Sequence, residues 1–484
     1  MARAATLAQD GHDVRIRWVT TNASRPAGLE ALIALERMVL RKGRRCGADA
    51  IDRNAVGGPL AGDAKPDIVV DFTDARHDAT AATRYLRPLY NGEAGESAAL
   101  AAIVAGDLPR IDVHNEIDDA ILVSGQPSAE AADGLSGALD TVMARTMTLL
   151  SAVLAGKSPY LTPKAETGRV RVRRSPTAYV LSGLAAEIAR RIYRLCCYAP
   201  HWHVGWRHTD DGGVWASGNL SGAPWAIIAD PGHCFYADPF PVTWQGRTFV
   251  FFEELDHRIG KGIISAIEFD AAGPKGPVMP ALEEPWHLSY PFLIEHGGAL
   301  WMIPESSLNG DVAIYRCTEF PVRWERHATL LSGLELGDAT IVRHNELYYL
   351  FGATRDGSGG YSDTLSIFYA ERLLGPWLPH SGNPIMVDRS CARPAGNFVR
   401  IDGKLWRPVQ DCSNGYGAAL GLAEINELSP TSFNQSVRHM LAPGPSWPGR
   451  KLHTLNRCGR LEVIDGSRIQ PKLAALRPLM GEAR

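Results

Sequence analysis

The chain has 484 residues, of which 45% are hydrophobic and 21% charged, and this composition fits a globular protein with room for about two to four domains. A formal net charge of −3 argues against a general polyanion-binding surface, so no nucleic-acid partner is expected. The eight cysteines form no CxxC pair or zinc spacing, no stretch of about 18 apolar residues occurs, and the N-terminus lacks a signal region. These features predict reduced thiols, no metal, no cofactor and a cytoplasmic location, and they leave the oligomeric state open.

Helices and strands alternate in the first third of the chain. The patterns predict a strand at Val14–Val19, a helix at Leu29–Arg41, a buried strand at Pro66–Phe72, and helices at Ala98–Ala105 and Ser136–Leu154. Such alternation favours a parallel sheet of Rossmann type, with its first strand missing because the chain opens in what reads as a helix. No GxGxxG motif follows a strand, so dinucleotide binding is not predicted.

Three segments of this region resemble the formyltransferase-like domain: PDIVVDF, LRPLYNGEAGESAALAAIVAGDLPRIDV and DTVMARTMTLL. Active members of that family use an Asn, a His and an Asp, with the first two in an Asn-x-His-Pro-Ser-type motif. The corresponding region here reads Tyr90-Asn91-Gly92-Glu93 without a histidine, and His114 stands in a different context. The resemblance implies a degenerate Rossmann-like α/β domain over residues 1–156, with acyl transfer as an alternative function.

Residues 157–200 read as a basic helical connector. Arg169–Arg174 is a basic run, and Tyr179–Tyr198 is an amphipathic helix with Arg190, Arg191 and Arg194 on one side. One interpretation is peripheral contact of residues 169–198 with an anionic membrane surface, at the inner face of the membrane. The other, which we favour, is a solvated helix between two domains.

An all-β pattern with an internal repeat begins near residue 201. Strand entrances, meaning the residues at the head of the first strand of each repeat, recur at Asp238, Tyr290, Asp338, Arg393 and His453. Each entrance is followed by a polar turn and a second apolar strand. A period of about 50 residues with several strands per unit is typical of a propeller, whose blades cover one another. Five copies predict a five-bladed β-propeller over residues 201–470, followed by a tail at 471–484.

The propeller geometry predicts a site, because the innermost strands of all blades meet around one axis. Carboxylates gathered there suit chemistry at an acetal carbon, where one acid is ionised and another stays protonated. The candidate catalytic residues are Asp238, Asp338 and Glu305. The candidate substrate-binding residues are Tyr290, Arg355, Arg393, Asp411, His453 and Glu254, which lie at entrances or at ends of second strands, as does Glu253.

Each candidate also has a structural interpretation. Asp238 could cap a turn or pair with Arg393, and Glu305 could bridge neighbouring blades. The arginines could bind a phosphate or carboxylate of a substrate, or neutralise the acids. His453 and Tyr290 could belong to the core. The stretches Gln410-Asp411 and Asn414-Gly415-Tyr416 form a candidate pocket loop.

Residues 200–466 resemble the five-bladed propellers of glycan-active enzymes, of the arabinanase and β-xylosidase type and of the invertase and levansucrase type. A closer resemblance is to the N-terminal domain of plant glucosamine inositolphosphorylceramide transferases, through YADPF…FFEE, LSYPFLIEHGG…MIPES, ARPAGNFVRIDGKLWRPVQDCSNGYG and LHTLN. By this resemblance Asp238 matches the base or nucleophile of the hydrolases. Their third acid, a Glu at a blade entrance, is absent, and Glu305 lies on a second strand instead.

These observations predict an enzyme of sugar transfer in polysaccharide or glycolipid biosynthesis, acting on a carbohydrate, sugar-phosphate or nucleotide-sugar substrate. Three alternatives remain: a glycoside hydrolase with the same site, a non-catalytic glycan-binding or scaffold propeller, and formyltransferase-like acyl transfer by the N-terminal domain.

Overall fold

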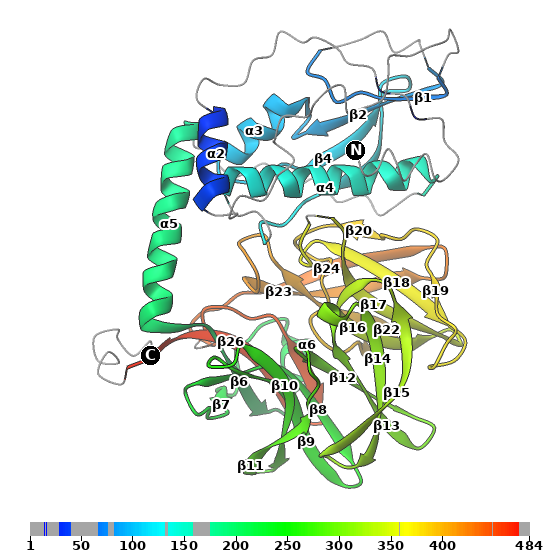
Figure 1. Ribbon diagram of the computed structural model, residues 1–484. Coiled ribbons are helices and arrows are strands. Elements are labelled where there is room, and N and C mark those ends of the chain that lie inside the picture. Colours follow the sequence, from blue (N-terminus) through cyan, green and yellow to red (C-terminus); the bar gives the residue numbers. More distant parts are fainter. Residues whose placement is uncertain are drawn as a thin grey trace. The chain divides into compact units, whose positions relative to one another are not determined.

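The computed structural model describes residues 14, 16, 29–39, 66–75, 82–130, 134–157, 175–357, 359–447 and 449–473. The chain divides into two compact units (Figure 1). The first comprises Met1–Ala186 with Gly357–Gly360, and the second comprises Glu187–Asp356 with Tyr361–Arg484. Among the described helices, none has the length and apolar character needed to cross a bilayer.

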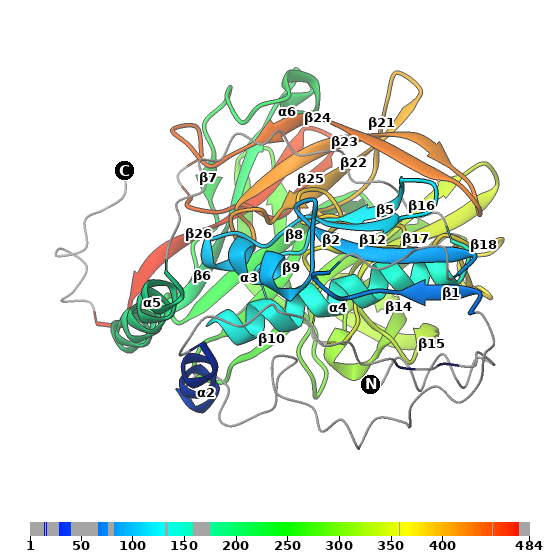
Figure 2. The same cartoon turned by 90° about the horizontal axis from the view of Figure 1, so that it is seen from above.

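The first unit holds a mixed sheet with strand order β1-β2-β4-β5 and β3 beside β2. Its elements are α2 (Leu29–Val39), β1 (Ile68–Val70), β2 (Arg84–Tyr90), β3 (Glu93–Ala94), α3 (Glu96–Val104), β4 (Ile111–Asn115), β5 (Ala120–Gly125) and α4 (Gly134–Leu154). Helix α4 packs on β4 and β5 and against α2 and α3, and it runs along the sheet in both views (Figure 1, Figure 2).

The predicted parallel sheet of Rossmann type is wrong for the described strands. Only β1 and β2 pair in parallel, whereas β2 pairs antiparallel with β3 and β4, and β4 with β5. The reason is local: β4 and β5 are joined by a short turn rather than by a crossover helix, and such a turn makes neighbouring strands antiparallel. The three predicted helices are confirmed, with ends shifted by a few residues. The strand predicted at Val14–Val19 lies largely outside the described residues, as does the basic run Arg169–Arg174. The formyltransferase resemblance stays a prediction.

The second unit opens with α5 (Pro176–Cys196), which crosses the division between the units, and then consists of antiparallel sheets. Blade 1 contains β8 (Cys234–Trp244), β9 (Arg247–Asp256), β10 (Lys261–Asp270) and β11 (Gly273–Leu282). Blade 2 contains β12 (Ser289–His296), β13 (Ala299–Glu305), β14 (Asp311–Glu319) and β15 (Arg323–Ser332). Blade 3 contains β16 (Glu335–His344), β17 (Leu347–Arg355), β18 (Thr364–Ala370) and β19 (Leu378–Pro379), with β20 (Met386–Val387) also paired to β18.

The remaining two blades bring both ends of the unit together. Blade 4 contains β21 (Val399–Ile401), β22 (Lys404–Asp411), β23 (Ala419–Leu428) and β24 (Phe433–Leu441). Blade 5 contains β25 (Leu455–Cys458), β26 (Leu461–Pro471), β6 (Cys197–His208) and β7 (Ala226–Ile227). The short helices α6 (Gly213–Ser217) and η3 (Ser307–Asn309) lie in connections. Because β26 pairs antiparallel with β6, the last and first strands of the unit share one sheet.

Blade-to-blade contacts close this unit into a circle. The inner strand β8 contacts β12 of blade 2, β12 contacts β16 of blade 3, and β25 of blade 5 contacts β8. Arg393, at the entrance of blade 4, bonds to Asp338 of blade 3, and the Leu455 amide at the start of blade 5 donates to the Ala395 carbonyl of blade 4. The five predicted repeats are therefore confirmed as five sheets that meet their neighbours in sequence order.

Short hairpin turns fix the register of the inner strand pairs. The loops Gln245-Gly246, Gly297-Gly298, Asn345-Glu346 and Asp402-Gly403 each have positive φ at both residues, as type I′ turns require. Their mirror-image twist matches the twist of the flanking strands. Four turns predicted from the sequence are thus confirmed, and the fifth, expected at Cys458-Gly459, lies one residue later because Cys458 pairs with Leu461.

Candidate active site

Three of the five strand entrances share an unusual backbone conformation. Asp238, Tyr290 and Asp338 have φ of 52°, 43° and 56°, in the left-handed region that costs a non-glycine residue about 1–3 kcal/mol. At each one the pairing register shifts, so the residue has no direct cross-strand partner. Such bulges re-aim side chains near functional sites. The repeat therefore directs chemically useful side chains away from the regular alternation of the strand.

Asp238 lies where blade 1 meets blade 5. Its carboxylate accepts a 2.7 Å hydrogen bond from the Thr454 hydroxyl, and Nδ1 of His453 is 3.7 Å away. Asp465 accepts from the Asp238 amide at 3.0 Å and from Nδ1 of His453 at 2.5 Å. Burial raises the pKa of Asp238 to about 6, although the nearby imidazole opposes this shift. With this pKa, Asp238 is mostly ionised at pH 7.

His453 acts as the charged partner of these two acids. Burial lowers its pKa, but the charges of Asp465 and Asp238 outweigh burial, and the net pKa lies above the usual value. Its imidazole stacks on Trp202 with ring centres 3.9 Å apart. His453, predicted to bind substrate, is thus an imidazolium held between two carboxylates in this geometry.

Asp338 is tied to blade 4. Nε of Arg393 donates to it at 2.5 Å and the Gln410 amide donates at 3.1 Å. Burial raises the pKa of Asp338 to about 7, with Arg393 opposing this shift and Glu305 adding to it. Glu305 accepts from the Asp338 amide at 3.1 Å, so it bridges blades 2 and 3. This contact is the structural role that the sequence left open for Glu305.

Neighbouring residues on β9 lie on opposite sides of the strand. Glu253 is 6% exposed, and burial together with Asp238, Glu305, Asp465 and Asp338 raises its pKa well above the usual value. Nε2 of His287 is 3.3 Å from Glu253, and burial lowers the pKa of His287, so this neighbour is uncharged. Glu254 instead accepts from the Ser265 hydroxyl at 2.6 Å. The structure therefore favours Glu253 over Glu254 as the site acid.

Tyr416 lies against this group from the loop that follows β22. Its ring is 4.8 Å from the Arg393 guanidinium and 5.2 Å, edge-on, from the His453 ring. Lys451 donates to the Tyr416 carbonyl at 2.8 Å. The candidate pocket loop thus supplies a half-buried aromatic surface beside the acids.

Three predicted residues lie apart from the acids or inside the core. Tyr290 is fully buried, and its hydroxyl bonds to Thr340 at 2.8 Å and to the Gly396 amide at 2.7 Å, so it packs between blades rather than offering a ring to a sugar. Arg355 pairs with Glu335 at 3.3 Å at the exposed end of β17. Asp411 accepts from the Ser413 amide at 2.9 Å, as a turn residue does.

The sequence offered Gln410 only as part of the candidate pocket loop, and it missed Asp465. Gln410 occupies, on β22, the position that Glu253 and Glu305 occupy on β9 and β13, and aligning these second strands by their turns finds it. Asp465 lies nearer to the turn of its own hairpin, because β26 begins at Leu461, the partner of Cys458. Alignment by turns therefore does not find Asp465.

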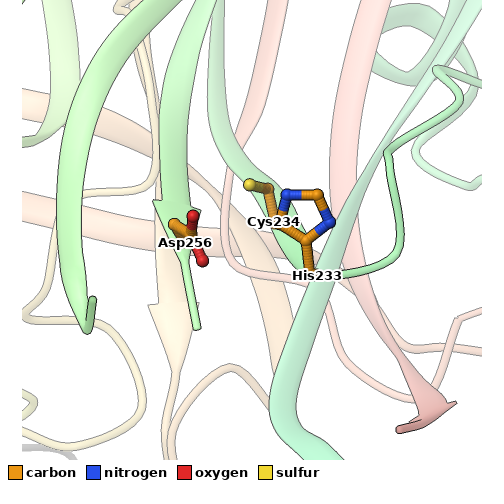
Figure 3. A group of neighbouring side chains, drawn as sticks. All are labelled: His233, Cys234 and Asp256. Atoms are coloured by element: carbon orange, nitrogen blue, oxygen red, sulfur yellow. The ribbon is translucent and has the colours of Figure 1, made fainter. Parts of the chain in front are cut away.

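Two sets of described side chains bring three metal-ligating groups within 4.8 Å: His233, Cys234 and Asp256, drawn in Figure 3, and Asp238, His453 and Asp465. In the first set Arg258 donates to Asp256 at 2.6 Å and lowers its pKa to about 2, and burial raises the pKa of Cys234 to about 12. A metal binds the thiolate, not the thiol. In the second set the imidazolium already provides the positive charge. In both sets, therefore, a carboxylate already has a positively charged partner, Arg258 in the first and His453 in the second.

The second unit is a β-propeller with five blades that carries buried carboxylates at its strand entrances. A family model described as glucosamine inositolphosphorylceramide transferase 1, N-terminal, matches residues 210–465, more than half of the chain. The chain belongs to this family.

Curated relatives match the same part of the chain. The glucosamine inositolphosphorylceramide transferase 1 of Arabidopsis thaliana is 32% identical over 249 residues, which cover 49% of this chain and 32% of the relative. The protein of the same name from Oryza sativa subsp. japonica is 32% identical over 262 residues, covering 51% of this chain and 35% of the relative. This chain therefore spans about a third of the length of these relatives.

Solved structures with some similarity are glycoside hydrolases. Zg3597, a family 117 glycoside hydrolase of Zobellia galactanivorans, has a TM-score of 0.36 and 12% identity over 50% of this chain and 77% of that chain. The catalytic domain of the Coprinopsis cinerea GH62 α-L-arabinofuranosidase has a TM-score of 0.37 and 16% identity over 53% of this chain and 85% of that chain. The strand order of this chain, not these similarities, defines the propeller.

Proposed function

We propose that this chain is a glycan-active enzyme of sugar transfer, acting in polysaccharide or glycolipid biosynthesis on a carbohydrate, sugar-phosphate or nucleotide-sugar substrate. Family membership supports a glycan-related role, because the relatives are named for transfer to an inositolphosphorylceramide. The observation that carries the proposal is the contrast between Asp238 and Glu253, two buried acids on the paired strands β8 and β9. Two carboxyl groups in unlike environments are what acid–base chemistry at an acetal requires.

The contrast assigns the roles. Asp238 accepts a hydrogen bond from the Thr454 hydroxyl and lies 3.7 Å from Nδ1 of the His453 imidazolium. The hydrogen bond and the positive charge both favour the ionised form of Asp238. It serves as base towards an acceptor hydroxyl, or as nucleophile at the anomeric carbon. Glu253 has an uncharged neighbour and a strongly raised pKa, so it holds the proton that the leaving oxygen takes up. If Asp238 is the base, it takes the proton of the acceptor hydroxyl while the acceptor oxygen bonds to the anomeric carbon and the bond to the leaving oxygen breaks. If Asp238 is the nucleophile, it bonds to that carbon first, and the acceptor oxygen then displaces it and gives its proton to Glu253.

One observation favours a second candidate, a glycan-binding propeller without catalysis. Arg393 occupies the entrance of blade 4 and bonds to Asp338. An arginine tied to an acid cannot donate a proton to a leaving group, since guanidinium stays charged. The glycoside hydrolases that this region resembles have a third acid, a Glu, at a blade entrance. The arginine at the entrance of blade 4 cannot replace that acid, so this feature argues against a simple hydrolase.

Paired variants on one strand test the proposal. Glu253→Gln removes the proposed proton donor, and Glu254→Gln is the matched control, because it alters the neighbouring acid on the opposite side of β9. Nucleotide sugars and aryl glycosides would be screened with glycolipid and oligosaccharide acceptors, and products followed by mass spectrometry. We expect Glu253→Gln and Asp238→Asn to lower kcat by about 10²–10⁴, while Glu254→Gln stays within about threefold.

The outcomes separate the candidates. Equal activity of Glu253→Gln and Glu254→Gln would remove the proposed proton donor. Absence of turnover in the wild type, together with oligosaccharide binding that Asp238→Asn abolishes, would establish the binding propeller instead. Melting temperatures of all variants would exclude loss of the fold as the cause.

A further inference from the structure

Helix α5 carries a row of large apolar side chains in contact with water. Ile188, Ile192 and Leu195 are 60%, 57% and 76% exposed. Their spacing of four and then three residues places them on one face of the helix. Tyr193, on another face, is partly buried. Isolated exposed apolar residues are common, but a contiguous apolar row of this kind marks a surface that meets a partner.

Positive charge lies beside and behind the row: at about 100° per residue Arg191 is next to it, whereas Arg194 and Arg190 are on the polar side of the helix. Glu187 pairs with Arg190 at 3.0 Å and with Arg191 at 2.9 Å, so one carboxylate is shared between two guanidinium groups. Arg194 lies in the last turn of the helix, and its carbonyl accepts a 2.6 Å bond from the Lys472 ammonium. Three arginines of the helix and Lys472 beside its last turn therefore stand against one anion, whereas the whole chain has a net charge of −3.

In place of the solvated helix favoured from the sequence, we propose that this face of α5 docks on an anionic lipid bilayer, with Ile188, Ile192 and Leu195 at the headgroup–acyl boundary and Arg191 beside lipid phosphates. A helix with an apolar face and Arg or Lys residues on its polar face binds in the interface plane in this way. Positive charge supplies the preference for anionic over zwitterionic lipid. A second copy of the chain fits less well, because a symmetric contact would bring two surfaces with the same excess of positive charge together.

Vesicle sedimentation of the full chain tests this docking, and it does not require the proposed sugar transfer to be correct. Vesicles of phosphatidylcholine alone would be compared with vesicles containing about one third phosphatidylglycerol, at about 0.1 M salt, where surface charges still act over about 10 Å. We expect wild type to partition at least about tenfold more strongly to the anionic vesicles, and this preference to fall as salt rises.

Two variants and one control identify the surface. Ile188→Ser combined with Ile192→Ser removes the apolar contact, and Arg191→Glu reverses one charge; each should weaken partitioning by about tenfold. Ile259→Ser removes an equally exposed isoleucine, 74% exposed, in the β9–β10 turn and should change nothing. Because these side chains are exposed, the substitutions should leave the melting temperature within about 2 °C.

The proposal fails if wild type does not partition to either vesicle, or if all variants partition as wild type does. It also fails if light scattering shows a dimer that the double serine variant converts to a monomer, because that result assigns the row to a contact between copies.

Discussion

Replacing Asp465 by Asn tests the junction between the first and last blades. One carboxylate oxygen accepts from the backbone amides of His453 and Thr454 at 3.0 and 2.9 Å. The other accepts from the Asp238 amide at 3.0 Å and from Nδ1 of His453 at 2.5 Å. Asn keeps the first pair of bonds but turns an amide NH2 towards the second pair of donors. The imidazolium then loses its counter-charge inside the protein.

The cost follows from this geometry. Removing one partner of a buried ion pair destabilises a protein by about 3–5 kcal/mol, and in a unit of this size 1 kcal/mol corresponds to about 2–4 °C. We therefore expect the melting temperature of Asp465→Asn to fall by roughly 6–20 °C. The control is Asp411→Asn, whose carboxylate is partly exposed and accepts from the Ser413 amide; its change should stay below about 0.5 kcal/mol.

The pH dependence of the stability of Asp465→Asn gives a second test of the same junction. The folded pKa of His453 is raised, so its stabilisation is fully present below the unfolded value of about 6.5 and is lost as pH rises through the folded pKa. The free-energy difference between wild type and Asp465→Asn, measured by urea unfolding with tryptophan fluorescence, should therefore be larger at about pH 6 than at about pH 9. A melting temperature within about 2 °C of wild type, or a difference that grows with pH, would refute this account.

Three further outcomes are expected. The folded pKa of Asp338 is raised to about 7, so its contribution to stability is present below the pKa of the unfolded state and is lost as pH rises through about 7. In urea unfolding between pH 5 and 8, the free energy of unfolding of Asp338→Asn should therefore fall less steeply with pH than that of wild type, by up to about 1.4 kcal/mol per pH unit. Parallel slopes would contradict this. Tyr416→Ala should weaken oligosaccharide binding in calorimetry by about tenfold, whereas Tyr416→Phe should retain it. The reason is that the aromatic ring, held against Arg393, is expected to make the contact with the sugar. Equal losses in both variants would assign the contact to the hydroxyl instead. Burial lowers the pKa of His203 to about 4, so the stability that neutral His203 contributes is lost as pH falls from about 6.5. In thermal scans between pH 7 and 5, His203→Phe should therefore lose less stability than wild type, by up to about 1.4 kcal/mol per pH unit. Equal acid sensitivity of the two proteins would contradict the lowered pKa of His203.

Sequence patterns predicted the propeller because its signals are local. A two-residue turn such as Gln245-Gly246 needs positive φ at both positions, and its sequence reveals this requirement. The direction of the N-terminal strands was not predictable in the same way, since alternation of helices and strands does not state whether a connection crosses over. The short turn between β4 and β5 decided that direction.

The site was only partly predictable for two physical reasons. The bulge at Asp238 and Pro239 shifts the register between β8 and β9, so counting from the entrance does not reveal whether Glu253 or Glu254 faces the other acids. Asp465 lies on β26, whose position depends on pairing with β6, more than two hundred residues earlier in the chain. No local pattern records such a long-range pairing.

That pairing makes blade 5 a seam between the beginning and the end of the second unit. During synthesis β6 and β7 emerge well before β25 and β26, so blade 5 cannot be completed until residues 455–471 have been made. The Thr454 hydroxyl donates to the Asp238 carboxylate and the Asp238 amide donates to Asp465, so both bonds also join the two ends of the unit. A chain that ends before residue 454 would therefore lack the Thr454 and Asp465 partners of Asp238, and this arrangement would arise only in molecules whose propeller has closed.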